Sequence, residues 1–66
     1  MTIRVNGASH EVPDNLNVSE LLAHLQLNVG RIAIERNLGV LPRHKWNETA
    51  VQAGDSFEIV QLVGGG

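Results

Sequence analysis

Residues 56–66 read SFEIVQLVGGG, a strand-like run followed by three glycines. Phe57 fits the inward face of a strand and Glu58 the outward face, as expected for a strand with one buried side. The first residues, TIRVNG at positions 2–7, alternate in the same way. If both segments lie in one sheet, the first and last strands most naturally pair in its centre and run parallel.

The residues after the first strand indicate a hairpin. Asn6-Gly7 stands between two alternating runs, and both residues tolerate the positive φ angles of a type I′ turn. The return strand is expected over residues 8–12, where Pro13 stops it because proline cannot donate a ladder hydrogen bond.

A helix is expected next. Asn17 is a candidate N-cap, with Glu20 three residues on in a capping-box arrangement. The segment VSELLAHLQL, residues 18–27, carries an apolar stripe at helical spacing, formed by Val18, Leu21, Leu22 and Leu25. Asn28 and Gly30 are expected to end the helix, since either residue can adopt a left-handed C-terminal conformation.

The remaining segments complete a small sheet. RIAIERN at 31–37 is expected as a third strand, 37–47 as irregular, and 49–52 as a possible short strand before a turn at AGDS. One helix packed on one face of a mixed sheet of four to five strands is an α+β, β-grasp fold. Within the irregular segment, Trp46 is expected to close one end of the core, with contact to a partner as the alternative.

Composition narrows the function. The chain has 66 residues and no cysteine, which excludes disulfides and thiolate chemistry. A net charge of −2, two aromatic residues and no basic cluster argue against nucleic-acid partners. The apolar runs are too short to span a bilayer and no signal peptide is visible, so a cytoplasmic protein, monomeric when free, is expected.

No conventional active site or metal site is visible in this sequence. The histidines are scattered, without the spacing of metal ligands, and neither HExxH nor GxSxG occurs. The acidic residues occupy expected turn, cap and exposed strand positions: Asp14, Glu20, Glu35, Glu48, Asp55 and Glu58.

The glycines are therefore the remaining candidate for chemistry. We expect residues 1–63 to form the folded domain and residues 64–66 a flexible tail, because glycine lacks a Cβ and can adopt nearly any backbone angle. For the same reason the tail can lie in a channel too narrow for side chains. The reactive group would be the α-carboxylate of Gly66, once its oxygen is made a good leaving group, for example by adenylation. A frayed terminus or a cloning remnant is the alternative.

The last strand has a second unusual feature. Continued alternation places Val60 and Leu62 outward with Glu58, and polar Gln61 on the core side. Either a bulge resets the register near Val60 and buries every aliphatic residue, or Val60 and Leu62 form an exposed patch for partner docking.

The ordered set of IRVNG, AIERN, P-R-x-x-W (Pro42, Arg43 and Trp46), a GD turn and a closing IVxxVGGG resembles the ThiS family, the sulfur carriers of bacterial thiamin biosynthesis. The resemblance covers essentially the whole chain. It implies the ubiquitin-like β-grasp fold and a carrier rather than an enzyme.

The resemblance also implies a mechanism and partners. An E1-like adenylyltransferase of the ThiF type would adenylate Gly66 using ATP, and no cofactor would stay bound to the carrier. A cysteine desulfurase relay would supply sulfur to give a thiocarboxylate, which donates it to thiazole synthase, the ThiG type. Gly64 and Gly65 would enter the partner with Gly66. Two alternatives are a sulfur carrier for molybdopterin or cysteine synthesis, and a ubiquitin-like protein tag.

Overall fold

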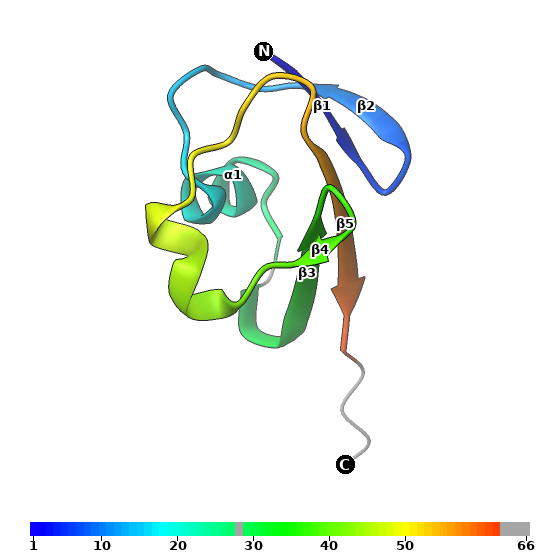
Figure 1. Cartoon of the computed structure of the whole chain (residues 1–66), viewed down its shortest axis with the longest axis vertical. Helices are drawn as coiled ribbons and strands as arrows, with labels where there is room; N and C mark the ends of the chain where they lie inside the picture. Colours follow the sequence, from blue (N-terminus) through cyan, green and yellow to red (C-terminus); the bar gives the residue numbers. More distant parts are fainter. Residues whose placement is uncertain (28, 63–66) are drawn as a thin grey trace.

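Two strands from opposite ends of the sequence lie side by side in the middle of the sheet (Figure 1). The computed structural model describes residues 1–27 and 29–62. Within them, five strands have the order β2-β1-β5-β3-β4. The strands are β1 (Thr2–Val5), β2 (Ala8–Glu11), β3 (Ile32–Arg36), β4 (Gly39–Val40) and β5 (Ser56–Gln61). The α-helix is α1 (Val18–His24), and the 3-10 helices are η1 (Val29–Arg31) and η2 (Arg43–Glu48).

The central pairing of β1 with β5 is parallel, with Arg4 opposite Ser56 and Val5 opposite Phe57. The pairings of β1 with β2, β3 with β4 and β3 with β5 are antiparallel. A mixed sheet with α1 packed over one face is the β-grasp arrangement, so the predicted fold class is confirmed.

The turn between β1 and β2 has the predicted geometry. Asn6 and Gly7 have φ angles of 51° and 82°, as a type I′ turn requires. Strand β2 ends at Glu11, one residue earlier than predicted. Val12 instead packs in the core, while its N–H still donates to the Met1 carbonyl at 2.9 Å.

The N-terminus of α1 is closed by the predicted capping box. The Glu20 N–H donates to Asn17 Oδ1 at 2.8 Å, and the Asn17 N–H donates to Glu20 Oε1 at 2.9 Å. Two backbone donors that lack helical partners are thereby satisfied.

The helix ends at His24, so the prediction that Asn28 and Gly30 end it was wrong. Gln26 adopts a left-handed φ of 58°. Its N–H donates to the Ala23 carbonyl at 3.0 Å, and the Leu27 N–H donates to the Leu22 carbonyl at 3.1 Å. This pair of bonds is a Schellman motif with glutamine in the position that glycine usually occupies, so no glycine or asparagine signalled it.

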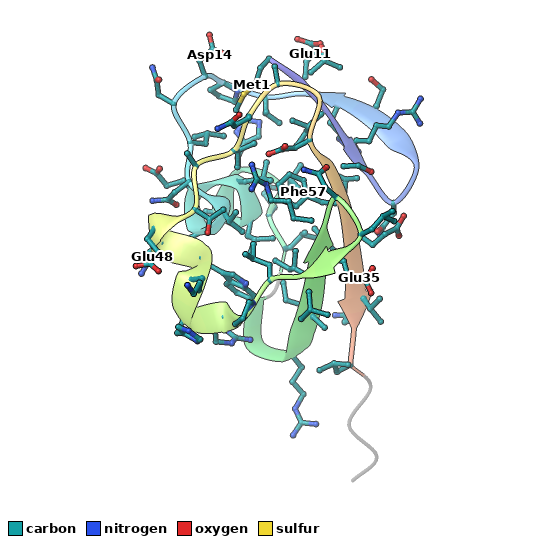
Figure 2. All side chains as sticks on the ribbon, in the orientation of Figure 1. Met1, Glu11, Asp14, Glu35, Glu48 and Phe57 are labelled. Atoms are coloured by element: carbon teal, nitrogen blue, oxygen red, sulfur yellow. The ribbon has the colours of Figure 1, made fainter. Side chains whose placement is uncertain are left out.

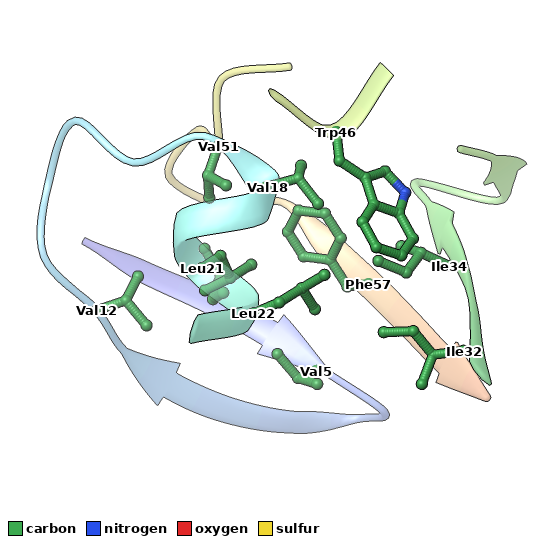
Figure 3. Close-up of a cluster of buried hydrophobic side chains, with 11 residues drawn as sticks. Val5, Val12, Val18, Leu21, Leu22, Ile32, Ile34, Trp46, Val51 and Phe57 are labelled. Atoms are coloured by element: carbon green, nitrogen blue, oxygen red, sulfur yellow. The ribbon is translucent and has the colours of Figure 1, made fainter. Parts of the chain in front are cut away.

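The core lies between α1 and the sheet (Figure 3). Phe57 from β5 is fully buried among side chains that include Val18, Leu22 and Trp46. Trp46 closes this end of the core, as predicted, and its Nε1–H donates to the Leu41 carbonyl at 3.1 Å. The buried apolar side chains are Ile3, Val5, Val12, Val18, Leu21, Leu22, Ile32, Ile34, Trp46, Val51 and Phe57.

Residues 37–52 are more regular at first, and less regular at the end, than predicted. Strand β4 and helix η2 lie in the segment expected to be irregular. The possible strand at 49–52 is absent from the described secondary structure, where Ala50 makes only an isolated bridge with Asn17. A two-residue strand and a 3-10 helix are too short to give a hydrophobic period that sequence alone could identify.

Asp55, predicted at a turn position, is buried. It accepts hydrogen bonds from Arg36 Nε at 3.0 Å, Asn37 Nδ2 at 3.2 Å and the Gln52 N–H at 2.8 Å. Arg36 Nη2 also forms an ion pair with it at 2.9 Å. The Asp55 side chain therefore joins the end of β3 to the loop that leads into β5.

We predict that Asp55→Ala lowers the free energy of unfolding by about 3 kcal/mol, because it leaves the Arg36 charge and two further donors without their acceptor. Urea denaturation followed by circular dichroism measures the change. Glu48→Ala is the control, since Glu48 is exposed, and it should change stability by less than about 0.5 kcal/mol. An unchanged urea midpoint for Asp55→Ala would contradict a structural role for this network.

Candidate functional site

The described part of the chain offers surfaces rather than a reaction centre. Its buried ionisable side chain, Asp55, is already engaged in the contacts above. The histidines lie apart on β2, α1 and η2, and among residues 1–27 and 29–62 no group of three metal-ligating side chains is present. None of the helices described has the length and apolar character needed to span a bilayer.

Strand β5 keeps its alternation to its end. Its pairing with β3 runs in unbroken register from Phe57 opposite Arg36 to Gln61 opposite Ile32, so the alternative of a bulge near Val60 was wrong. Val60 and Leu62 are 56% and 53% exposed. Both belong to the side of the sheet opposite α1, and their role in partner binding stays a prediction.

We call this side the outer face and define it by the outward residues of three neighbouring strands and the residue after β5: Ala33, Glu35, Val40, Glu58, Val60 and Leu62. Ala33 pairs with Val60, which makes an apolar row that Leu62 extends. In Figure 2, Glu35 lies at the periphery of the molecule, whereas Phe57 lies in its centre. The outer face thus carries a short apolar row on the side of the sheet opposite α1.

Two carboxylates adjoin this apolar row. Glu35 lies directly opposite Glu58, and on its other side it lies opposite Val40. Like charges in directly opposite positions destabilise a sheet. Among the described residues, the ion pairs are made by other carboxylates, Asp14 and Asp55, and neither Glu35 nor Glu58 forms one. The arrangement is complementary to a surface that presents a cation beside apolar side chains.

The turn between β3 and β4 extends the apolar surface to the sheet edge. Asn37 and Leu38 have φ angles of 50° and 74°, so Leu38 occupies a left-handed position that usually requires glycine. Its side chain is 95% exposed, and Val40 beside it is 78% exposed. An exposed leucine in a strained conformation contributes little to folding, which is a pattern found at contact sites.

The predicted reactive group lies outside the described residues. Leu62 is the last residue described, and its N–H donates to the Arg31 carbonyl at 2.7 Å. Val63, Gly64, Gly65 and Gly66 follow it in the sequence, so the predicted boundary at 63 and the role of Gly66 stay predictions.

Sequence reasoning did not find Glu35, Leu38 or Val40 as surface residues that belong with Val60. The alternation of RIAIERN already places Glu35 outward with Ala33. The signal that was missing is the register between β3 and β5, which depends on pairing across more than twenty positions of sequence.

Comparison with known proteins gives a consistent result. A model of the ThiS family matches residues 3–66. The chain is 30% identical to the sulfur carrier protein ThiS of Escherichia coli, with full coverage of both chains. It also superimposes on the crystal structure of a thiamine biosynthesis protein (ThiS) from Geobacter metallireducens with a TM-score of 0.87, at 36% identity and full coverage of both chains.

A second kind of relative is much longer. The chain is 35% identical over its whole length to a thiazole synthase of Paramagnetospirillum magneticum, but the match spans only 20% of that protein. A thiazole synthase of Magnetococcus marinus shows the same partial coverage, at 32% identity.

We predict that the double substitution Val60→Thr with Leu62→Thr changes the free energy of unfolding by less than about 1 kcal/mol, because threonine keeps the β propensity and little buried area is lost. Ile34→Thr is the matched substitution on the opposite side of the same sheet, where Ile34 is buried, and it should cost about 2–4 kcal/mol. Chemical denaturation of the three proteins measures both values. Similar losses for the two variants would mean that the end of β5 belongs to the core.

Proposed function

The chain belongs to the ThiS family, the sulfur carrier proteins of thiamine biosynthesis, and on that premise we propose how its sulfur is loaded and where it is delivered. An E1-like enzyme of the ThiF type adenylates the α-carboxylate of Gly66 with ATP and releases pyrophosphate. The terminal sulfur of a persulfide on a cysteine desulfurase relay attacks the adenylate and displaces AMP. A second thiol of the relay then cleaves the resulting acyl disulfide, so that the relay is left as a disulfide and the carrier keeps the sulfur. The resulting thiocarboxylate donates its sulfur to thiazole formation.

The need for adenylation follows from the chemistry of the carboxylate. A carboxylate anion is a poor electrophile, because neither oxygen is a good leaving group. Linking one oxygen to AMP makes a mixed anhydride, whose carbonyl a sulfur nucleophile can attack. The activating enzyme uses ATP for this step, so the carrier itself needs no bound cofactor.

The observation that carries the proposal is the run from Gly64 to Gly66 shortly after the central strand β5, in a chain without cysteine. Because the chain contains no thiol, we place the covalently carried sulfur on the carboxyl group of Gly66. Three residues without a Cβ can also enter a narrow channel in extended form. The ordering of such a segment costs about 1–2 kcal/mol per residue, which contacts with the partner would have to offset.

Thiazole synthase is the proposed recipient of the sulfur. In the two longer relatives, a segment similar to this chain belongs to a protein called thiazole synthase and makes up a fifth of its length. Joining two units in one chain keeps them at a high effective concentration, which benefits units that act together. We therefore propose that this chain and a separate thiazole synthase form the equivalent pair by association.

Docking is proposed to use the outer face. Its apolar row, Ala33, Val60 and Leu62, leads directly towards the glycines, so a partner held on this face has the reactive end within reach. The unpaired carboxylates of Glu35 and Glu58 favour a partner that carries a basic side chain there. Because activation consumes ATP, we also propose that the carrier works in the cytoplasm.

The stable variant described above provides a test of docking. Val60→Thr with Leu62→Thr should weaken binding to the adenylyltransferase and to thiazole synthase by about tenfold or more, since two exposed apolar side chains at an interface centre are lost. Isothermal titration calorimetry with each enzyme gives the affinities. Ser9→Ala on β2 serves as the control on a different strand, and unchanged affinity for the double variant would contradict docking through the outer face.

Loading of sulfur is tested by intact-mass spectrometry. After incubation with the adenylyltransferase, ATP and the sulfur relay, the chain should gain the mass difference between sulfur and oxygen, and a thiol alkylating reagent should then label Gly66. A variant without Gly66 should keep the parent's unfolding midpoint and lose adenylation by about 100-fold or more, because its carboxylate is misplaced by one residue. Lysine-linked conjugates without thiocarboxylate would instead support a protein tag.

A further inference from the structure

Strand β5 is longer than its parallel neighbour. Pairing with β1 ends at Val5 opposite Phe57, and the Asn6 N–H makes the last main-chain bond, to the Phe57 carbonyl at 2.8 Å. The positive φ of Asn6 then turns the chain away into the hairpin. Figure 1 shows β5 continuing past this turn, with β3 along one side.

The side chain of Asn6 takes over where the main chain of β1 stops. The Ile59 N–H donates to Asn6 Oδ1 at 2.7 Å, and Asn6 Nδ2 donates to the Ile59 carbonyl at 3.2 Å. The amide therefore supplies the acceptor and the donor that a further strand residue would have supplied. The parallel ladder ends with Ile59 fully satisfied.

Gln61, the next residue of β5 whose main-chain groups face the side of β1, lacks such partners. Its neighbour Leu62 faces β3, where the Leu62 N–H donates to the Arg31 carbonyl at 2.7 Å. Because main-chain groups alternate along a strand, the N–H and C=O of Gln61 point to the opposite side, beyond Asn6. No described residue pairs with them there, so Gln61 presents a short open strand edge.

A small pocket, lined by four aliphatic residues and two amide residues, adjoins this edge. It has a volume of about 230 Å³ and is lined by Val5, Asn6, Leu27, Ile32, Ile59 and Gln61. The lining comes from the ends of β1 and β5, the start of β3 and the residue that completes the Schellman motif of α1. The volume suits one aliphatic or aromatic side chain rather than a whole small-molecule ligand.

We propose that an extended segment of thiazole synthase pairs with β5 at Gln61 as an added strand and places one apolar side chain in this pocket. This inference rests on the proposed function, from which the identity of the partner comes. The open main-chain groups require an extended backbone as the occupant, and the pocket selects its side chain. The edge is five residues from Gly66, so an enzyme that receives the glycines lies against it. Thiazole synthase is the occupant we choose, because in two longer relatives a segment similar to this chain is part of a thiazole synthase.

The added strand would also direct the reactive end. Two hydrogen bonds at Gln61, together with the bond from Leu62 to Arg31, would hold both edges of the chain at the point where it leaves the sheet. The residues that follow would then enter the enzyme along the axis of β5.

Chemical synthesis of the 66-residue chain allows a direct test. Methylation of the Gln61 main-chain nitrogen removes the free donor and blocks the edge, but it leaves the bonds to β3 in place. We expect binding to thiazole synthase to weaken by about tenfold or more, with an unchanged unfolding midpoint. The matched control is methylation of the Glu11 nitrogen, which by its pairing points away from β1 on the outer edge of β2, and it should leave binding unchanged.

Hydrogen exchange of the unmodified chain gives an independent measurement. The Gln61 amide should exchange fast in the free chain and slowly in the complex, whereas the Leu62 amide should be protected in both. Leu27→Gln, which makes the pocket polar, should also weaken binding. Protection of Gln61 without the synthase, or in the adenylyltransferase complex alone, would overturn the proposal. So would normal binding by the Gln61-methylated chain, whereas a parent chain that does not bind the synthase at all would refute the proposed function itself.

Discussion

The parallel pairing of β1 with β5 is the constraint on which the rest of the structure depends. It places Arg4 opposite Ser56 and Val5 opposite Phe57, and it includes the bond from the Arg4 N–H to the Asp55 carbonyl at 2.9 Å. Parallel neighbours cannot be joined by a tight turn, so the intervening chain must cross over one face of the sheet, and α1 covers the core on the way. Closing so long a loop costs entropy, which the burial of Phe57 beneath α1 helps to offset.

That pairing also gives β5 two unlike ends. At its start, Asp55 is bound by Arg36, Asn37 and the main chain of Gln52, so this end is cross-linked to β3. In a 66-residue chain without disulfides, such a buried polar network takes the place of a covalent link. At the other end, Leu62 makes a single bond to Arg31 beyond the last paired strand residues. Stability is therefore concentrated at the end of β5 opposite the glycines.

Local signals in the sequence were sufficient for some elements and insufficient for others. The Asn6-Gly7 turn and the Asn17–Glu20 capping box were predictable because each depends on neighbouring residues. The end of α1 was not, because Gln26 adopts a conformation that glycine usually signals. The burial of Asp55 and the opposition of Glu35 to Glu58 depend on the register of β3 against β5, which no local pattern specifies. Alternation in the sequence placed Val60 and Leu62 on the same side of β5 as Glu58. It could not show whether a bulge interrupts the strand, or which side of the sheet is covered.

The outer face and the open edge at Gln61 border the same last residues of β5, one on its surface and one along its side. A partner that binds the face covers Leu62, and a strand added at Gln61 lies immediately next to it. An adenylyltransferase and a thiazole synthase that both need this end would exclude each other, so the carrier would have to dissociate from the first before it binds the second. Exchange of this kind favours a modest apolar surface supplemented by directional hydrogen bonds. Hydrogen bonds that form only with the correct partner add specificity, whereas a large hydrophobic interface would dissociate slowly. The small outer face, with its apolar row and its two carboxylates, has the character that such repeated exchange requires.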